Sequence, residues 1–185
     1  MRVSTGRYKG RELDYPRAGL RPTKAITRQA MFNIVGSRVR GAKVCDLYAG
    51  GGSLGIEALS QGAASVVFVE QQATVFRFLR ANVKGLPDAT VIRGDVLRVL
   101  KKLAGTGFEL VFADPPYLHG LVQATIDGAA EFGILGPDGW FVAEHHRREM
   151  PSPPAGWETI KQGTYGETLV SVLRRTIRGA DEVRS

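Results

Sequence analysis

The chain has 185 residues and a formal net charge of +7, and its length suits one domain with its own core. A hydrophobic fraction of 43% excludes a disordered chain, and the single cysteine, Cys45, excludes an intrachain disulfide and a cysteine-based zinc site. With no leader and no apolar stretch of about 18 residues, we expect a cytoplasmic protein without a membrane span, and the positive charge favours a polyanionic partner.

The N-terminal residues predict a short β-hairpin, in which residues 2–5 pair with residues 11–15 around Gly6 and Gly10. We expect a helix over residues 24–36, with Thr23 as its N-cap. Apolar residues at helical spacing predict its buried face, which consists of Ile26, Ala30, Met31 and Ile34.

From Lys43 onward, predicted strands and helices alternate. The strands are expected at 44–48, 65–69, 90–93, 108–113 and 140–144, and the helices at 53–61, 72–84, 96–103 and 120–131. Two late strands, 157–162 and 168–174, have no helix between them and turn at Tyr165-Gly166. This pattern predicts an α/β fold with a doubly wound, mostly parallel sheet and one antiparallel strand. We treat residues 1–185 as one domain, in which residues 1–23 form a basic hairpin and lid segment.

A glycine-rich turn follows the first strand of this alternating region, and reads Asp46-Leu47-Tyr48-Ala49-Gly50-Gly51-Gly52-Ser53-Leu54-Gly55. Its glycines satisfy a G-x-G-x-x-G pattern that would also admit a dinucleotide. Asp46 argues against one, because its carboxylate would repel a pyrophosphate. The same carboxylate suits the ammonium group of S-adenosylmethionine (SAM), directly or through water.

Further acids follow the next strands at the edge where ligands of parallel sheets bind. Glu70 has the spacing to accept hydrogen bonds from ribose hydroxyls, and Asp95 to accept one from an adenine amino group. The predicted SAM-binding residues are Asp46, Tyr48, Gly50, Gly52, Glu70, Gln71, Asp95 and Val96.

The most specific motif is Asp114-Pro115-Pro116-Tyr117, which follows the fourth strand. An aromatic amino group is a poor nucleophile, because its lone pair is delocalised into the ring. Rigid acceptors, the Asp114 carboxylate and the Pro115 carbonyl, would draw its N–H groups and stabilise positive charge on the nitrogen. Pro116 adds rigidity and Tyr117 can stack on a flipped base, so we predict that these four residues are catalytic.

Basic residues near the N-terminus predict an RNA-binding surface, and we expect the hairpin to pack beside the catalytic edge. The predicted RNA-binding residues are Arg2, Arg7, Lys9, Arg11, Arg21, Thr23 and Arg28. The three histidines, His119, His145 and His146, lack metal-ligand spacing. We therefore predict no metal site, and interpret the histidines as surface or loop residues.

These motifs resemble the class I SAM-dependent methyltransferases with a D/N-P-P-Y motif. More closely, the chain resembles the bacterial 16S rRNA guanine-N2 methyltransferases of the RsmD type. The similarity covers nearly the whole chain, including Arg21-Pro22-Thr23, Asp46-Leu47-Tyr48-Ala49-Gly50, Phe68-Val69-Glu70, Asp114-Pro115-Pro116-Tyr117 and Tyr165-Gly166. The chain departs from the family pattern at Ala25-Ile26, Gln29, Gly51 and Gln61.

The resemblance implies a seven-stranded Rossmann-like fold with an N-terminal hairpin, SAM as cofactor, and ribosomal RNA or a small-subunit assembly intermediate as partner. Its expected reaction is methylation of a guanine N2 in 16S rRNA. The four-residue motif leaves adenine N6 in DNA, or another RNA base, open as the target. A non-catalytic RNA-binding protein is a further alternative, against which the intact motif argues. Asp46 argues against an NAD(P)-dependent oxidoreductase.

Overall fold

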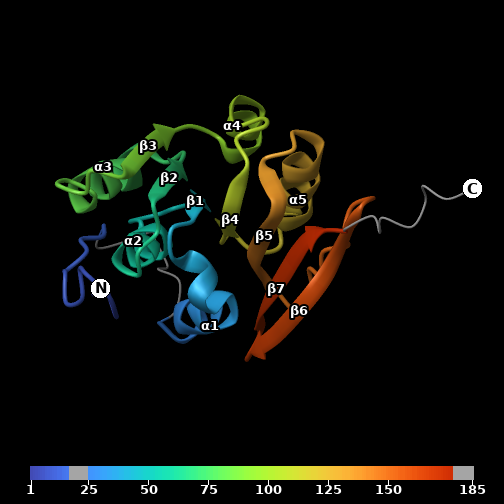
Figure 1. Cartoon of the computed structure of the whole chain (residues 1–185), viewed down its shortest axis with the longest axis horizontal. Helices are drawn as coiled ribbons and strands as arrows, with labels where there is room; N and C mark the ends of the chain where they lie inside the picture. The colour runs from blue at the N-terminus through green and yellow to red at the C-terminus, as the bar shows by residue number, and fades with distance from the viewer. Residues whose placement is uncertain (17–24, 177–185) are drawn as a thin grey trace, which may run out of the picture.

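Seven strands form the sheet in the computed structural model, which describes residues 1–16 and 25–176 (Figure 1). The strands are β1 Lys43–Leu47, β2 Ser65–Glu70, β3 Ala89–Arg93, β4 Phe108–Ala113, β5 Leu135–His146, β6 Trp157–Tyr165 and β7 Thr168–Arg175. The helices are α1 Ala25–Val35, the 3-10 helix η1 Gly36–Val39, α2 Ser53–Ser60, α3 Ala73–Asn82, α4 Val96–Lys102 and α5 Leu121–Glu131. Thr23, Arg21 and the rest of the predicted lid after residue 16 lie outside the described residues.

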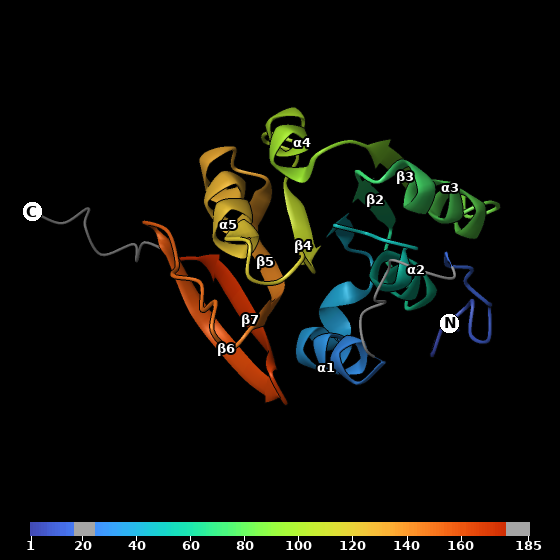
Figure 2. The same cartoon turned by 180° about the vertical axis from the view of Figure 1, so that it is seen from behind.

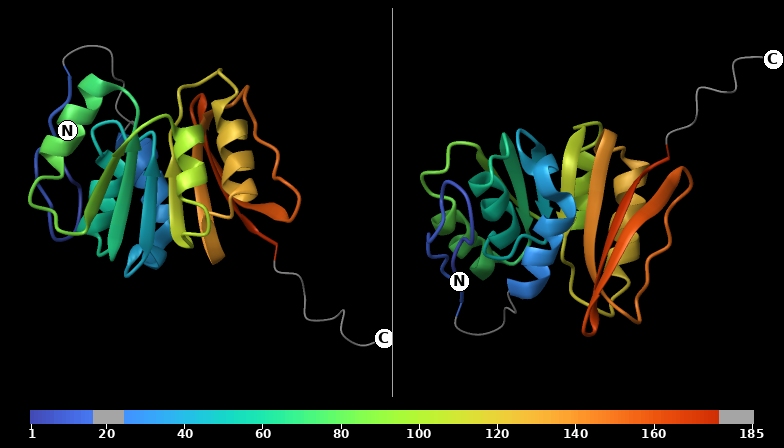
Figure 3. Two further views of the ribbon diagram at one scale, coloured as in Figure 1. Left: turned by 90° about the horizontal axis from the view of Figure 1, so that it is seen from above. Right: turned by 60° about the horizontal axis from the view of Figure 1, so that its bottom comes forward.

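The strand order is β3-β2-β1-β4-β5-β7-β6, and β7 runs antiparallel to both of its neighbours. The doubly wound, mostly parallel sheet with one antiparallel strand is therefore confirmed. Helices cover both faces: α1, α2 and α3 lie on one, and α4 and α5 on the other (Figures 2 and 3). No helix in the described ranges is long and apolar enough to cross a bilayer.

The strand β4 is buried on both faces, as its apolar run predicts. Leu110 and Phe112 pack in the core under α1 and α2, while Val111 and Ala113 face the core under α4 and α5. This alternation follows from the two-residue period of a strand, which sends successive side chains to opposite faces. A strand covered on both sides reads as a continuous hydrophobic run.

The predicted buried face of α1 is wrong in part. Ala30 and Met31 are buried as expected, but Ile26 is 71% exposed, and Phe32 packs against Phe112 with ring centroids 5.4 Å apart. The helix also buries Arg28. A polar residue on this face is tolerated only because other parts of the chain satisfy its guanidinium.

The turn between β6 and β7 also lies one residue later than predicted. Tyr165 and Thr168 form the last pair, so that Gly166 and Glu167 make the connection. Gly166 has φ 69°, and the favoured two-residue hairpin turns require a positive φ at their first central position.

The N-terminal hairpin is present, but one bridge between Arg2 and Glu12 replaces the two predicted strands. Its backbone is held mainly by α2. The Glu57 carboxylate accepts from the backbone N–H groups of Ser4 and Thr5 at 2.7 and 2.9 Å. Glu57 also lies 4.0 Å from the Arg28 guanidinium, and both side chains are buried. A buried charge on α2 thus joins the hairpin to α1.

We predict that Glu57→Ala destabilises the fold by about 3–5 kcal/mol, because it leaves the buried Arg28 charge without its carboxylate. Denaturant unfolding measures this loss. Glu12→Ala is the matched control, because the Arg2–Glu12 pair is exposed and should contribute less than about 1 kcal/mol. Equal effects of the two substitutions would contradict the bracing role of Glu57.

Candidate active site

The carboxyl ends of β1, β2 and β4 bring three predicted acids to one edge of the sheet. Leu47 of β1 pairs in register with Val69 of β2 and Ala113 of β4. Glu70 and Asp114 come directly after these partners, so they flank the chain as it leaves β1. The strand order reverses between β1 and β4, which is where ligands bind in open α/β sheets.

The glycine-rich turn after β1 is shaped by backbone conformations that favour glycine. Gly50 and Gly52 have φ 56° and 88°, and Gly52 caps the start of α2. A Cβ atom on Gly55 would lie 2.2 Å from the Phe68 ring, so glycine there allows α2 to pack closely on β2. Tyr48 has φ 61°, and its hydroxyl is hydrogen-bonded to Thr125 of α5 at 2.7 Å.

Asp46 lies at the centre of the site and is 1% exposed. One carboxylate oxygen accepts the backbone N–H of Gly55 at 2.8 Å. The pKa of Asp46 is raised to about 7, mainly by burial. The Gly55 hydrogen bond opposes this rise, and the neighbouring charges of Asp114 and Glu70 add to it. Three carboxylates crowded together in this way favour a bound cation.

The other predicted SAM-binding residues line the edge beyond β2 and β3. Glu70 is buried and accepts the backbone N–H groups of Gly50 at 3.0 Å and Gln72 at 2.7 Å. Asp95 is exposed and caps α4 by accepting from Arg98 N at 3.0 Å. The Gln71 side chain is exposed and the Val96 side chain is buried. Contacts between these residues and SAM remain predictions.

The Asp114-Pro115-Pro116-Tyr117 loop leaves β4 beside this acidic cluster. Asp114 is half-buried, Pro115 is buried and Pro116 is exposed. The Tyr117 hydroxyl donates to Glu144 of β5 and is hydrogen-bonded to Thr168 of β7 at 3.1 Å.

Burial and then the Glu144 hydrogen bond raise the pKa of Tyr117, so its hydroxyl stays protonated at neutral pH. The ring is therefore fixed before any substrate binds. Sequence analysis missed Glu144 and Thr168. The only signal was an acid at the end of a buried apolar strand.

Of the predicted RNA-binding residues that the structure describes, four lie on the hairpin and Arg28 contacts it, but their side chains are in different environments. Arg2 pairs with Glu12, and Arg7 and Lys9 are exposed. Arg11 donates to the carbonyls of Asn82 and Lys84 at the end of α3, at 2.9 and 2.8 Å.

Arg28 does not lie on the surface, as a phosphate contact would require. It is 5% exposed and donates to Arg2 O and Ser4 Oγ at 3.3 and 3.1 Å. Its guanidinium is thus used inside the fold.

The hairpin tip also lies away from the catalytic edge. Arg7 N and Tyr8 N donate to the carbonyl and hydroxyl of Ser60, the last residue of α2, at 2.7 and 2.8 Å. Because α2 has eight residues, its end lies about 12 Å along the axis from the glycine-rich turn. Only the last hairpin residues return to that turn, where Tyr15 lies against Gly51.

The interpretation of His145 as a surface residue is wrong. It is fully buried at the end of β5, where its ring is hydrogen-bonded to Ser171 at 2.8 Å. Burial lowers its pKa, so the ring is neutral at pH 7. Within residues 1–16 and 25–176, no group of three or more His, Cys, Asp or Glu side chains is arranged to hold a metal ion.

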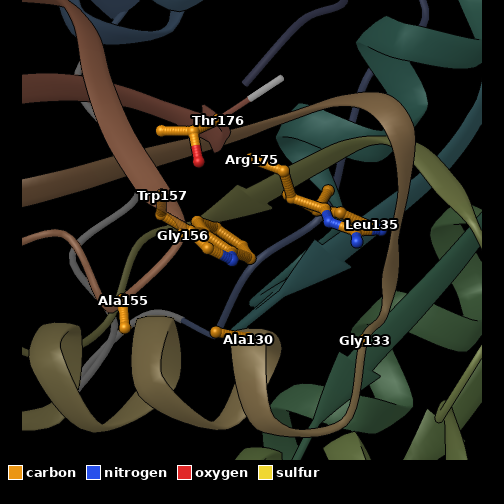
Figure 4. A pocket seen from close by; sticks show the side chains of 8 residues that line it. All are labelled: Ala130, Gly133, Leu135, Ala155, Gly156, Trp157, Arg175 and Thr176. Atoms are coloured by element: carbon orange, nitrogen blue, oxygen red, sulfur yellow. The ribbon is translucent and has the colours of Figure 1, made fainter. Parts of the chain in front are cut away.

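A pocket of about 610 Å³ lies at the opposite edge of the sheet, near the start of β5 (Figure 4). Its walls come from α5, β5, β6, β7 and the segments next to them, and comprise Ala130, Gly133, Leu135, Ala155, Gly156, Trp157, Arg175 and Thr176. It contains none of the predicted catalytic or SAM-binding residues. The acidic edge therefore remains the candidate active site.

Comparison with known families gives a match over residues 1–174, to the family described as Conserved hypothetical protein 95. The chain belongs to this family. "Putative rRNA methyltransferase YlbH" of Bacillus subtilis is 36% identical, with 95% of this chain and 99% of the relative covered. "Ribosomal RNA small subunit methyltransferase D" of Escherichia coli is 30% identical, over 98% of this chain and 93% of the relative.

Solved structures show the same fold. The "Putative methyltransferase yhhF" of Escherichia coli superposes with a TM-score of 0.82 at 30% identity, covering 95% of this chain and 97% of the other. The chain is therefore a class I methyltransferase, the fold class that uses SAM as methyl donor. The site fits SAM, because its buried carboxylates suit the ammonium and sulfonium charges.

Asp46 makes the stability of the SAM-free protein depend on pH. With a pKa raised from 3.8 to about 7, the folded state binds more protons than the unfolded state between these values. The free energy of unfolding therefore falls as pH rises through this window. We predict that Asp46→Asn removes this fall, so the variant gains stability relative to the wild type toward pH 8. Thermal unfolding at several pH values measures the difference.

The same titration predicts that SAM affinity of the wild type rises about tenfold from pH 6 to pH 8, because only ionised Asp46 attracts the ammonium group. Asp46→Asn should bind SAM weakly at both pH values. Calorimetric titration measures both proteins. A wild-type affinity that does not change with pH would contradict this role of Asp46.

Proposed function

We propose that this protein transfers a methyl group from SAM to the exocyclic N2 of a guanine in small-subunit ribosomal RNA. The observation that carries the proposal is the position of Asp114, at the strand-order reversal beside the acidic cluster, in a loop whose Tyr117 is already fixed. The names of the Bacillus subtilis and Escherichia coli relatives support rRNA as the substrate. Its place of action is then the cytoplasm, on rRNA or on a small-subunit assembly intermediate.

The acids and the glycine-rich turn bind and orient the cofactor. Asp46 attracts the ammonium group, Glu70 accepts from the ribose hydroxyls, and Gly50 and Gly52 let the backbone approach the ligand. Asp95 and Val96 border the adenine. When bound, SAM supplies an electrophilic methyl group on a positively charged sulfur.

The motif residues act on the target nitrogen. Asp114 and the carbonyl of Pro115 accept its two N–H groups, which turns the nitrogen lone pair toward the methyl group. As the nitrogen becomes positively charged, the Asp114 carboxylate stabilises that charge. The carboxylate then accepts one proton from the nitrogen and passes it to solvent, which leaves a neutral methylated amine. Tyr117 stacks on the base, and its hydrogen bonds to Glu144 and Thr168 keep the ring in place.

The direct test is methyl transfer from labelled SAM to two substrates: 16S rRNA transcribed in vitro, and small subunits from a host that lacks the gene. Mass spectrometry of the digested RNA then identifies the product. N2-methylguanosine supports the proposal. N6-methyladenosine, or methylation of DNA alone, would assign the enzyme to the alternative target.

We predict that Asp114→Ala lowers single-turnover methyl transfer at least about 100-fold, because it removes the acceptor at the reacting nitrogen. SAM affinity should stay within a few-fold of the wild type. Asp114→Asn is the matched control: it keeps one acceptor oxygen, so its rate should lie between the other two. A loss below tenfold in the alanine variant would show that Asp114 is not the main acceptor.

A further inference from the structure

The turn that follows β5 is attached directly to the catalytic loop. The Glu149 carboxylate accepts the backbone N–H of Leu118 at 2.7 Å and that of Gly120 at 2.6 Å. The rings of Tyr117 and His146 lie 6.0 Å apart. The segment His146–Met150, which we call the β5 turn, is therefore positioned by the same loop that carries Asp114.

The catalytic loop holds a strained residue at this junction. Leu118 has φ 63°, which is costly for a residue with a branched side chain, and it is 59% exposed. Glu149 binds the chain at Leu118 and again at Gly120, so it maintains the conformation that turns Leu118 outward. A strained backbone conformation persists only where surrounding contacts hold the residue in it, and such residues are common at functional sites.

Exposed apolar side chains gather here as well. Among the described residues, four large hydrophobic side chains are exposed: Met1, Ile26, Leu118 and Met150. Two of these, Leu118 and Met150, belong to the two segments that Glu149 joins. Apolar side chains next to the catalytic loop suit contact with the faces of unstacked nucleobases.

The β5 turn also carries two exposed cations. In the part of the chain that the structure describes, the Arg148 guanidinium has no hydrogen-bond or ion-pair partner. Arg147 lies 3.4 Å from Glu167, and both side chains are more than half exposed, so this pair is weak and easily exchanged.

The acidic interior explains why cations are needed here. Asp46, Glu70 and Asp114 repel phosphates, yet a target base can reach Asp114 only if its backbone lies close by. Cations at the edge of the site can hold that backbone. The hairpin supplies few of them, since Arg28 is buried, Arg11 is bound to the end of α3, and the tip lies at the far end of α2.

We propose that the β5 turn is the main phosphate-binding surface for the RNA substrate, with Arg147 and Arg148 holding phosphates next to the flipped nucleotide. Leu118 and Met150 contact the neighbouring bases. The proposal rests on the proposed function, since it assumes that the substrate is RNA, and it moves the main RNA contact from the hairpin to the other side of the catalytic loop.

The test is a salt titration of binding to in vitro transcribed 16S rRNA. We expect Arg147→Ala/Arg148→Ala to lower affinity at least tenfold at about 0.1 M salt, and to make the salt slope shallower by roughly 1.5–2 units. The double lysine variant, Arg147→Lys/Arg148→Lys, should keep most of the slope. The matched control is Lys101→Ala/Lys102→Ala, which removes the same charge from the exposed end of α4 and should behave as wild type.

Two further measurements separate this proposal from the proposed function. SAM affinity and thermal stability of each variant should equal those of the wild type, and wild-type methyl transfer to RNA must be detectable. Suppose that the wild type methylates RNA, but that Arg147→Ala/Arg148→Ala has the same RNA affinity and salt slope as the control Lys101→Ala/Lys102→Ala. The β5 turn is then not the RNA surface. If Leu118→Ser/Met150→Ser impairs transfer only on assembled subunits, the apolar patch binds a ribosomal protein and the RNA proposal is wrong.

Discussion

Hydrogen bonds from the glycine-rich turn to two buried carboxylates are the interactions on which the site depends. Gly55 N–H donates to Asp46 and Gly50 N–H donates to Glu70, so the turn is tied to the strands on which it sits. The acids expected to attract the cofactor therefore also shape the loop that would cradle it. Because these groups are already in place, binding a cation requires little rearrangement, which reduces its entropic cost.

The N-terminal hairpin has a structural role, although its basic sequence predicts an RNA-binding segment. Its contacts with Glu57, Ser60 and the end of α3 fix it along α2. Net charge counts every arginine alike, whether it faces solvent or satisfies a buried carboxylate. A cation bound inside the fold adds little to the field that a polyanion meets at the surface.

Much of the architecture could be predicted from the sequence, because β-α alternation and the right-handed crossover rule leave few topologies. The parallel arrangement also predicts that three acids lie at one edge of the sheet, because parallel strands have their carboxyl ends on the same side. These acids are Asp46, Glu70 and Asp114. The partners of these residues could not be predicted in this way. Tyr117 meets Glu144 across 27 residues, and Leu118 meets Glu149 across 31, only because β5 lies beside β4.

Errors at α1 and His145 share one physical cause. Hydrophobic periodicity assumes that polar side chains face water, but Arg28 and His145 are buried with specific partners, Glu57 and Ser171. A pattern based on hydrophobicity alone cannot include a partner that comes from another element. Such pairs become visible only when the chain has folded and the partner is adjacent.

The contact between Tyr15 and Gly51 makes the residue types allowed at these two positions depend on each other. A Cβ atom on Gly51 would lie 2.5 Å from the Tyr15 ring, so the aromatic side chain occupies the space that any larger residue at position 51 needs. The two positions cannot drift independently. A lineage that gains a side chain at position 51 must also shift the Tyr15 ring or replace it with a smaller side chain.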